Sequence, residues 1–139
     1  MSVEICAMGM ADYAEVIALW QQSEGIGLSQ ADQPERIAAY LERNPGMSFT
    51  ARESGLLLGA ALAGHDGRRG YLHHLAVRAD RRGQGIGRLL VVSCLEALGQ
   101  AGIDKCHLFV FGKNQAGIAF WKRIGWQERV EIELMSKNI

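Results

Sequence analysis

Residues 75–90 constrain the fold of this chain more than any other stretch. They read Leu-Ala-Val-Arg-Ala-Asp-Arg-Arg-Gly-Gln-Gly-Ile-Gly-Arg-Leu-Leu, so an apolar strand runs into a basic, glycine-rich loop that opens an amphipathic helix. Glycines let the backbone curl tightly, and the first amides of a helix have no acceptor within it. Arg81, Arg82 and Arg88 add full positive charges around the same point. The stretch therefore predicts a seat for a phosphate or pyrophosphate.

Two well-known phosphate loops do not fit these residues. A Walker loop needs Lys-Ser or Lys-Thr after the glycines, and neither pair follows them. The dinucleotide fingerprint Gly-x-Gly-x-x-Gly also fails. Counted from Gly83, its third glycine would fall at Arg88, and counted from Gly85 it would fall at Leu90.

The pattern that does fit is Arg-x-x-Gly-x-Gly at residues 82–87, after a strand that ends Leu-Ala-Val. It resembles the central motif of the GNAT superfamily of acyl-CoA-dependent N-acetyltransferases. Residues 114–126 are similar to a second family pattern, Asn-x-x-Ala/Gly-x-x-Phe-Tyr-x-x-x-Gly-Phe, with Trp121 at the usual Tyr and Trp126 at the usual Phe. The resemblance covers essentially the whole chain. It implies transfer of an acetyl group from acetyl-CoA to a primary amine.

The order of elements predicts an α/β fold. Apolar spacing indicates strand, helix, helix, three strands, helix, strand, helix and strand, in one domain over residues 1–139. Asp12-x-x-Glu15 and Asp32-x-x-Glu35 are capping-box patterns that predict two helix starts. Residues 130–134 alternate apolar and charged side chains, which predicts a half-exposed last strand that could pair between two subunits.

The resemblance implies a more specific architecture. This is the GNAT acyl-CoA acyltransferase fold, a mixed, mostly antiparallel sheet flanked by helices, with central strands that splay apart. Backbone groups freed by the splay would hold the pantetheine arm and the acyl carbonyl, and the loop amides would hold the pyrophosphate. The cofactor-binding residues implied by position are Leu75, Ala76, Val77, Arg82, Gly83, Gln84, Gly85, Ile86, Gly87, Arg88, Asn114, Phe120 and Trp121.

Charge and cysteine content exclude several other classes. The chain has 15 basic and 15 acidic residues and no block of like charge, so neither nucleic acid nor an anionic membrane is expected as a partner. Cys6, Cys94 and Cys106 are scattered in apolar runs, which predicts buried thiols in a reducing cytoplasm. No Cys-x-x-Cys or His-x-x-x-His pair indicates a metal site. The sequence shows neither a signal peptide nor a membrane-spanning run, so a cytoplasmic protein is expected.

His73 is the candidate general base. Aligned on Leu-Ala-Val, it falls where arylalkylamine N-acetyltransferases of the same superfamily carry a histidine that faces the acceptor. A neutral imidazole suits proton abstraction near neutral pH. Strand alternation places Tyr71, His73, Leu75 and Val77 on one face, and it places His74 on the other, packed against a helix. The alternative is that His73 only makes structural hydrogen bonds in the sheet.

Trp121 leaves the general acid open. Many family members carry a Tyr at this position, proposed to protonate the departing thiolate, whereas indole is only a hydrogen-bond donor. Tyr71, on the face of His73, could serve instead, or the thiolate could leave unassisted because a thiol pKa of about 8.5 makes it a tolerable leaving group. The favoured interpretation of Trp121 is an aromatic wall for the cofactor.

Candidate acceptor contacts carry opposite charges. Glu24, in the loop at residues 23–29, could pair with an ammonium group, whereas Asp66 and Arg68 lie in a polar turn at residues 64–70. Asp32 is interpreted as a helix cap. The acceptor is therefore not readable from charge, although the compact chain favours a small molecule. A protein N-terminus or lysine as acceptor, and a non-catalytic acyl-CoA-binding module, remain as alternatives.

Overall fold

The computed structural model describes residues 2–139, and the chain divides into two compact units, Met1–Phe109 and Val110–Ile139. The first unit holds the β-sheet and three α-helices. The second holds α4 (Gln115–Arg123) and the last part of the chain. The single domain expected over residues 1–139 stays a prediction.

The first unit is built on a five-stranded sheet in the order β1-β2-β3-β4-β5. The three pairings among β1, β2, β3 and β4 are antiparallel, and the pairing of β4 with β5 is parallel. The sheet is therefore mixed and mostly antiparallel, as predicted. The strands are β1 (Glu4–Ala7), β2 (Phe49–Glu53), β3 (Leu56–His65), β4 (Gly70–Val77) and β5 (Cys106–Leu108).

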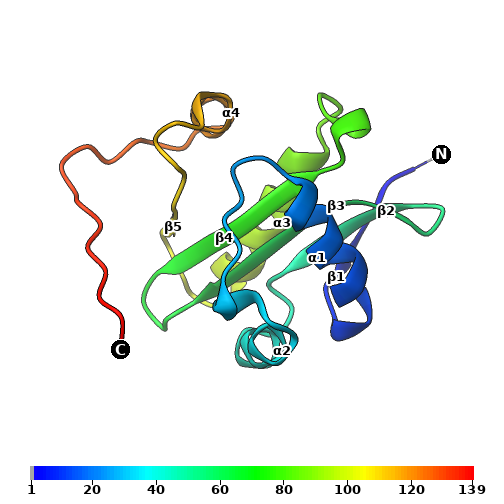
Figure 1. Ribbon diagram of the computed structural model, residues 1–139, viewed down its shortest axis with the longest axis horizontal. Helices are drawn as coiled ribbons and strands as arrows, with labels where there is room; N and C mark the ends of the chain where they lie inside the picture. Colours follow the sequence, from blue (N-terminus) through cyan, green and yellow to red (C-terminus); the bar gives the residue numbers. More distant parts are fainter. Residues whose placement is uncertain (1) are drawn as a thin grey trace. The chain divides into compact units, whose positions relative to one another are not determined.

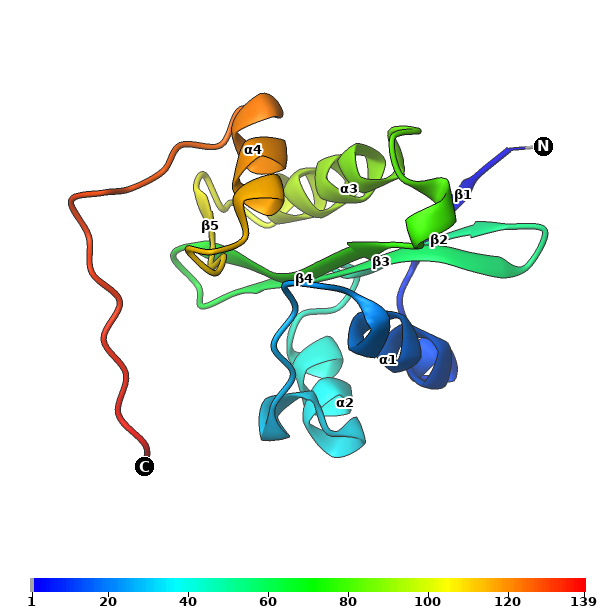
Figure 2. The same cartoon turned by 45° about the horizontal axis from the view of Figure 1, so that its top comes forward.

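Helices cover both faces of this sheet (Figure 1, Figure 2). Helices α1 (Tyr13–Gln22) and α2 (Pro34–Arg43) lie on one face, and α3 (Ile86–Gln100) lies on the other. Residues 57–64 of β3 are all buried, because this central strand is covered on both faces. The core between the sheet and the α1–α2 face comprises Val16, Leu19, Trp20, Ile37, Leu57, Ala60, Leu62 and Ala76.

Strands β4 and β5 separate after a short common stretch. Their pairing covers only Gly70, Tyr71 and Leu72 of β4. Within the described part of the chain, no strand pairs with residues 73–77 on the edge that faces away from β3. The splay implied by the family resemblance is therefore present, and it leaves the second half of β4 with an open edge.

A bulge in β4 lies at the start of that open edge. His74 pairs with Leu62, and Leu72 pairs with the next residue of β3, Ala63. His73 is thus an extra residue without a partner on β3. Such an insertion breaks the two-residue side-chain period of a strand.

The predicted placement of the two histidines on opposite faces is wrong because of this bulge. The His73 ring lies 5.5 Å from the ring of Tyr40 on α2, edge to face. The His74 ring lies 4.9 Å from the ring of Trp20 on α1. Both imidazoles therefore lie on the α1–α2 side of the sheet.

The predicted last strand is also wrong. No strand is assigned after β5 in residues 109–139, and Val130, Ile132 and Leu134 are exposed. A strand is stable only when its backbone groups are paired with a neighbour, and alternation of side chains does not supply that neighbour. The expectation of three buried thiols holds only at Cys94, because Cys6 on the edge strand β1 is exposed and Cys106 is of intermediate exposure.

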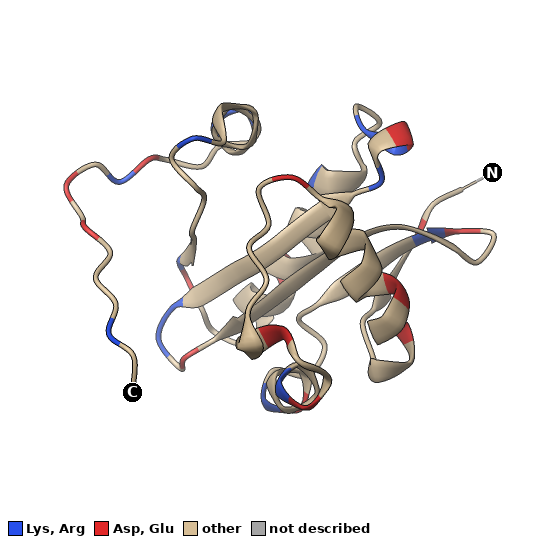
Figure 3. Cartoon of the chain, in the orientation of Figure 1, with Lys and Arg blue, Asp and Glu red and all other residues tan. Residues whose placement is uncertain are grey.

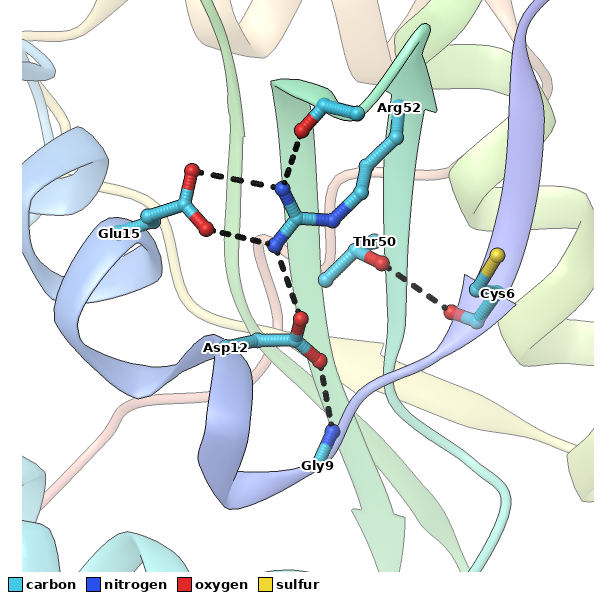
Figure 4. A network of polar contacts seen from close by, with 7 residues as sticks. Cys6, Gly9, Asp12, Glu15, Thr50 and Arg52 are labelled. Carbon is cyan, nitrogen blue, oxygen red and sulfur yellow. Dashed lines mark hydrogen bonds and ion pairs between the residues drawn. The ribbon is translucent and has the colours of Figure 1, made fainter.

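The two capping-box aspartates lie at helix starts as predicted, since Asp12 is the N-cap residue of α1 and Asp32 lies two residues before α2. Their side chains, however, cap short 3-10 helices that precede α1 and α2. Asp12 ends η1 (Met10–Asp12), where its Oδ2 accepts from the Gly9 amide at 2.9 Å. Its Oδ1 accepts from Arg52 Nη2 on β2 at 2.9 Å, and Glu15 of α1 contacts the same guanidinium at 2.9 Å (Figure 4). Arg52 therefore fastens the start of α1 to the sheet.

We expect Arg52→Met to lower the free energy of unfolding by about 1–3 kcal/mol, because a half-buried charged hydrogen-bond network loses its centre. Urea denaturation followed by circular dichroism measures the change. The control is Arg129→Met, which breaks the exposed Arg129–Glu131 pair. An exposed pair contributes about 0–1 kcal/mol. Equal losses in the two variants would contradict the assignment.

Candidate functional site

The glycine-rich loop forms a set of backbone donors at the start of α3. Gly83 and Gly85 have φ values of 77° and 84°, in the region that favours glycine, and Gly85 is the N-cap of the helix. The amide of Leu89 is bonded to the Gly85 carbonyl at 3.1 Å. The helical amides before it, up to Arg88, therefore have no acceptor within the helix. The positive end of the helix dipole lies at the same place.

Other loop residues hold this turn in place. Ile86 is only 2% exposed, so its side chain anchors the helix in the core. A ligand could therefore contact Ile86 only through its backbone amide. Gly87 follows it in the first helical turn, and Arg88 is exposed. In the described residues no ion pair is found for Arg88. Figure 3 shows basic segments gathered on the loop before α3.

The three arginines of the predicted phosphate seat do not share one role. Arg81 forms a two-pronged ion pair with Glu53 of β2, at 3.0 and 3.3 Å, and its Nε donates to Gln84 at 3.1 Å. The expected contribution of Arg81 to phosphate binding is therefore corrected: its charge is balanced within the protein. Arg82 Nε donates to the Val77 carbonyl at 3.1 Å and so bends back over the end of β4. The sequence carries no local signal of Glu53, which lies far from the loop along the chain.

The open edge of β4 offers backbone groups close to this loop. The Arg78 amide donates to the Leu58 carbonyl of β3 at 2.8 Å. In an antiparallel ladder, residues two apart point their N–H and C=O groups the same way. Ala76 therefore faces β3, as Arg78 does, whereas Leu75 and Val77 turn their N–H and C=O groups toward the open edge. Of the three expected backbone contacts, the open groups are the amide and carbonyl of Leu75 and the amide of Val77, because the Val77 carbonyl already accepts from Arg82 Nε.

A cavity of about 280 Å³ lies where β4 ends and the loop begins. It is formed by the C-terminal end of α1 together with the first residues after β4. Its lining residues are Leu19, Gln22, Ser23, Val77, Arg78, Ala79, Asp80 and Arg82.

His73 and Tyr71 belong to a row of rings on the α1–α2 side of β4. The Tyr71 ring is nearly parallel to that of His73, at a centroid distance of 6.2 Å, and to that of Phe109, at 6.3 Å. The sequence correctly placed Tyr71 and His73 on one face. Desolvation and the neighbouring His74 lower the pKa of His73 below its ordinary value, against an opposing effect of Asp32. The lowered pKa favours the neutral, proton-accepting form of His73, whose ring packs against Tyr40 on one side while the rest of the side chain is exposed.

His74 is bonded to a carboxylate that the sequence did not connect with it. Its Nε2 lies 2.8 Å from Oδ1 of Asp32, and both side chains are largely buried, at 14% and 8% exposure. Asp32 does cap a helix, as predicted, but the helix is η2 (Gln30–Asp32), where its Oδ2 accepts from the Ser29 amide at 3.0 Å. The two partners are 42 residues apart, so local sequence patterns carry no sign of the contact.

The expected acceptor contacts lie in different places. Glu24 is exposed in the loop after α1. Asp66 accepts hydrogen bonds from the amides of Arg68 and Arg69, both at 2.8 Å, and these bonds lower its pKa. Asp66 therefore stabilises the β3–β4 turn, and Arg68 is exposed beside it. That turn precedes β4, whose opposite end is roughly 23 Å away at strand geometry, so Asp66 and Arg68 are separated from the glycine loop.

The downstream motif forms the helix of the second unit. Asn114 is the N-cap of α4, and its Oδ1 accepts from the Gly117 amide at 2.9 Å. The Trp121 ring packs edge to face against Phe120 at 5.1 Å and Trp126 at 5.2 Å. Within this unit the motif residues thus fix one another around a short helix.

Two kinds of feature are absent from residues 2–139. No group of three or more His, Cys, Asp or Glu side chains that could hold a metal ion is found among them. In the same residues, no helix is both long enough and apolar enough to span a membrane.

A mixed sheet whose strands part beside a glycine-rich helix N-terminus is the architecture of acyl-CoA-dependent N-acyltransferases. The sequence comparison identifies the family: the model of the Acetyltransferase (GNAT) family matches residues 13–126, and the chain belongs to this family. The chain is thus an acetyltransferase, as the resemblance in its two motifs implied.

Relatives and solved structures agree with this assignment. Acetyltransferase SG1711 of Sodalis glossinidius (strain morsitans) is 30% identical over 138 residues, which are 99% of this chain and 96% of the relative. The PaiA N-acetyltransferase of Thermoplasma acidophilum, solved in complex with coenzyme A, has a TM-score of 0.79 at 19% identity and 91% coverage of both chains. AAC(6')-Iy, solved with the bisubstrate analog CoA-S-monomethyl-acetylneamine, has a TM-score of 0.78 at 16% identity and 100% coverage of both.

Proposed function

We propose that the protein transfers the acetyl group of acetyl-CoA to a primary amine of a small molecule at the open edge of β4. The observation that carries the proposal is the position of this edge. It begins at the bulge that displays His73 and ends at the glycine loop before α3. An acyl donor anchored by its pyrophosphate at the loop would lie along the edge and bring its thioester toward His73.

Coenzyme A would be held mainly by backbone groups. The pyrophosphate would lie on the amides of residues 83–88, close to Arg82 and Arg88. The amide and carbonyl groups of Leu75 and the amide of Val77 would bond the pantetheine arm, as a neighbouring strand would. Asn114, Phe120 and Trp121 are proposed to line its far side, as the family resemblance implies.

The chemistry needs a neutral amine and a stabilised oxyanion. His73, whose pKa is lowered, would take a proton from the acceptor ammonium, directly or through water. The amine would then attack the thioester carbonyl, and a backbone N–H of the open edge would stabilise the developing negative charge on its oxygen. When the C–S bond breaks, the attacking nitrogen loses its second proton to solvent, and the thiolate leaves unassisted or takes a proton from Tyr71, which solvent then reprotonates.

Solved structures of this fold include enzymes named for small-molecule acceptors and enzymes named for ribosomal-protein acceptors, and we propose the first class for this chain. The ligand in the structure of AAC(6')-Iy joins coenzyme A to monomethyl-acetylneamine. The cavity beside Ser23 has a volume of about 280 Å³, and its lining includes Val77 and Arg82, so it lies at the end of β4 where coenzyme A would bind. Glu24 would attract the ammonium group of the acceptor from the loop that borders this cavity.

An acceptor panel with thiol detection tests the proposal. Acetyl-CoA is offered with small primary amines, among them neamine, and separately with lysine-containing peptides and peptides with a free N-terminus. The proposal expects coenzyme A release with at least one small amine above the rate without acceptor. Release with peptides alone would favour protein acetylation, and saturable acetyl-CoA binding without turnover by any acceptor would contradict the proposal.

Arg88→Gln is expected to weaken acetyl-CoA binding roughly tenfold, because an unpaired cation beside a pyrophosphate seat contributes about 1–2 kcal/mol. Isothermal titration calorimetry with acetyl-CoA measures the affinity. Arg81→Gln is the matched comparison, because it removes a loop arginine that is already paired with Glu53. It should lower stability more than affinity, and a larger loss of affinity than in Arg88→Gln would contradict the assignment.

A further inference from the structure

Two aspartates of this chain occupy the same local position and contact the sheet through different partners. Asp12 and Asp32 each end a 3-10 helix, and one oxygen of each accepts from the amide at the start of that helix. The other oxygen of Asp12 binds Arg52 of β2 (Figure 4), whereas that of Asp32 binds His74 of β4. The same arrangement thus occurs twice: an aspartate that caps a 3-10 helix also binds a side chain of the sheet. That side chain is a permanent cation, Arg52, in the first case and a histidine, His74, in the second.

The Asp32–His74 pair is the more deeply buried of the two. Its side chains are 8% and 14% exposed, against 20% for both Asp12 and Arg52. The Asp32 carbonyl also accepts from the hydroxyl of Tyr13 at 2.6 Å, so the pair is joined to α1. Removing either partner would leave the other with an uncompensated buried polar group.

The location of the pair connects two parts of the proposed site. His74 follows the bulged residue His73 and precedes Leu75, which has open backbone groups. Asp32 closes the segment at residues 23–33, which carries Glu24 and borders the cavity at Ser23. A bond of 2.8 Å thus holds the segment between α1 and α2 on the strand along which the thioester would lie.

A histidine suits this position better than an arginine. Tyr40 of α2, Tyr71 and His74 of β4, and Asp32 of η2 surround His73. Burial raises the pKa of Tyr40 to about 12, so this phenol stays neutral. An arginine in place of His74 would put a permanent cation beside the base and oppose its protonation during catalysis. An imidazole can donate to Asp32 while remaining neutral.

We propose that the Asp32–His74 pair positions the acceptor site, holding residues 23–33 against β4 so that the acceptor amine meets His73. The role of the pair as an acceptor-positioning element rests on the proposed function. Neither residue touches the reacting atoms in this account, and both act through the segment and through His73.

Hydrogen exchange of the ligand-free protein tests the fastening directly. In Asp32→Asn the neutral side chain still caps η2, but the charge-assisted bond to His74 is lost, so amides of residues 23–33 should exchange roughly tenfold faster or more. Asp12→Asn is the matched control, because it weakens the equivalent contact at Arg52. It should leave exchange in residues 23–33 unchanged. Wild-type exchange in Asp32→Asn, or equal acceleration by Asp12→Asn, would overturn the proposal.

His74→Gln allows a second measurement, the pKa of His73. Loosening of residues 23–33 alone would not change this pKa in the same way. Loss of the imidazole removes a group whose protonated form lowers the pKa of His73 and leaves Asp32, which raises it. The His73 resonance in an NMR titration should therefore shift to a higher pKa, and an unchanged midpoint would contradict the inference. Asp32→Asn and His74→Gln each remove one partner of the pair, so the inference can be tested with whichever of the two variants folds.

Calorimetry with coenzyme A separates this inference from the proposed function. Asp32→Asn and His74→Gln should bind coenzyme A within about twofold of wild type, since the loop amides are untouched. Loss of coenzyme A binding in both variants would contradict a role confined to the acceptor side. Absence of binding by the wild-type protein would instead contradict the proposed function, while the exchange result would still decide whether the pair fastens the segment.

Discussion

Replacing Gly85 with valine is expected to weaken acetyl-CoA binding by roughly a hundredfold or more, equivalent to about 2.7 kcal/mol. Gly85 has a φ of 84° and is the N-cap of α3. A β-branched residue is strained at this φ, so the turn must change shape. The amides that follow would then no longer converge on one point. Titration calorimetry with acetyl-CoA measures the loss.

Gly67→Val is the matched control for this variant. Gly67 has a similarly positive φ of 93°, and in both glycines a Cβ would meet no atom within 4 Å. The two substitutions therefore impose similar backbone strain, but Gly67 lies in the β3–β4 turn at the other end of β4. It should lower the melting temperature by a similar amount and keep acetyl-CoA affinity. Wild-type affinity in Gly85→Val would remove the loop from the binding site.

The glycine loop was predictable from the sequence because its signals are local. A helix start, a left-handed turn and exposed amides each depend on a few consecutive residues, and the loop at residues 82–87 contains all of them. The order of strands and helices up to β5 was predictable for the same reason, since side-chain period reports the face that each element buries. The last strand was not, because period does not say whether a pairing partner exists.

Contacts between distant segments account for the other differences. The loop charge of Arg81 is balanced by Glu53 of β2, and His74 is bonded to Asp32 across 42 residues. Neither partner differs in its local pattern from an ordinary surface or capping carboxylate. The bulge at His73 likewise depends on the register between β3 and β4. Strict alternation assumes that no residue is inserted, so it placed Tyr71 and His73 correctly on one face but put His74 on the wrong face.

His73→Gln is expected to lower kcat/KM by roughly a hundredfold to ten-thousandfold, the usual contribution of a general base. Glutamine keeps a polar side chain on the strand but cannot accept a proton at neutral pH. The measurement uses the best amine of the acceptor panel, with acetyl-CoA binding checked by calorimetry. Binding should persist in the variant, because His73 does not contact the loop that holds the pyrophosphate.

The pH dependence gives this substitution its decisive test. Because the pKa of His73 is lowered, the wild-type enzyme keeps a neutral base below the ordinary histidine range and loses activity as the pH falls through that lowered pKa. The variant should lack this acidic limb and retain only the dependence that comes from the amine. His107→Gln is the control, since His107 also lies beside Tyr71, with ring centroids 5.9 Å apart, but on β5. A wild-type acidic limb in His73→Gln, or its loss in His107→Gln, would assign the proton transfer to another group.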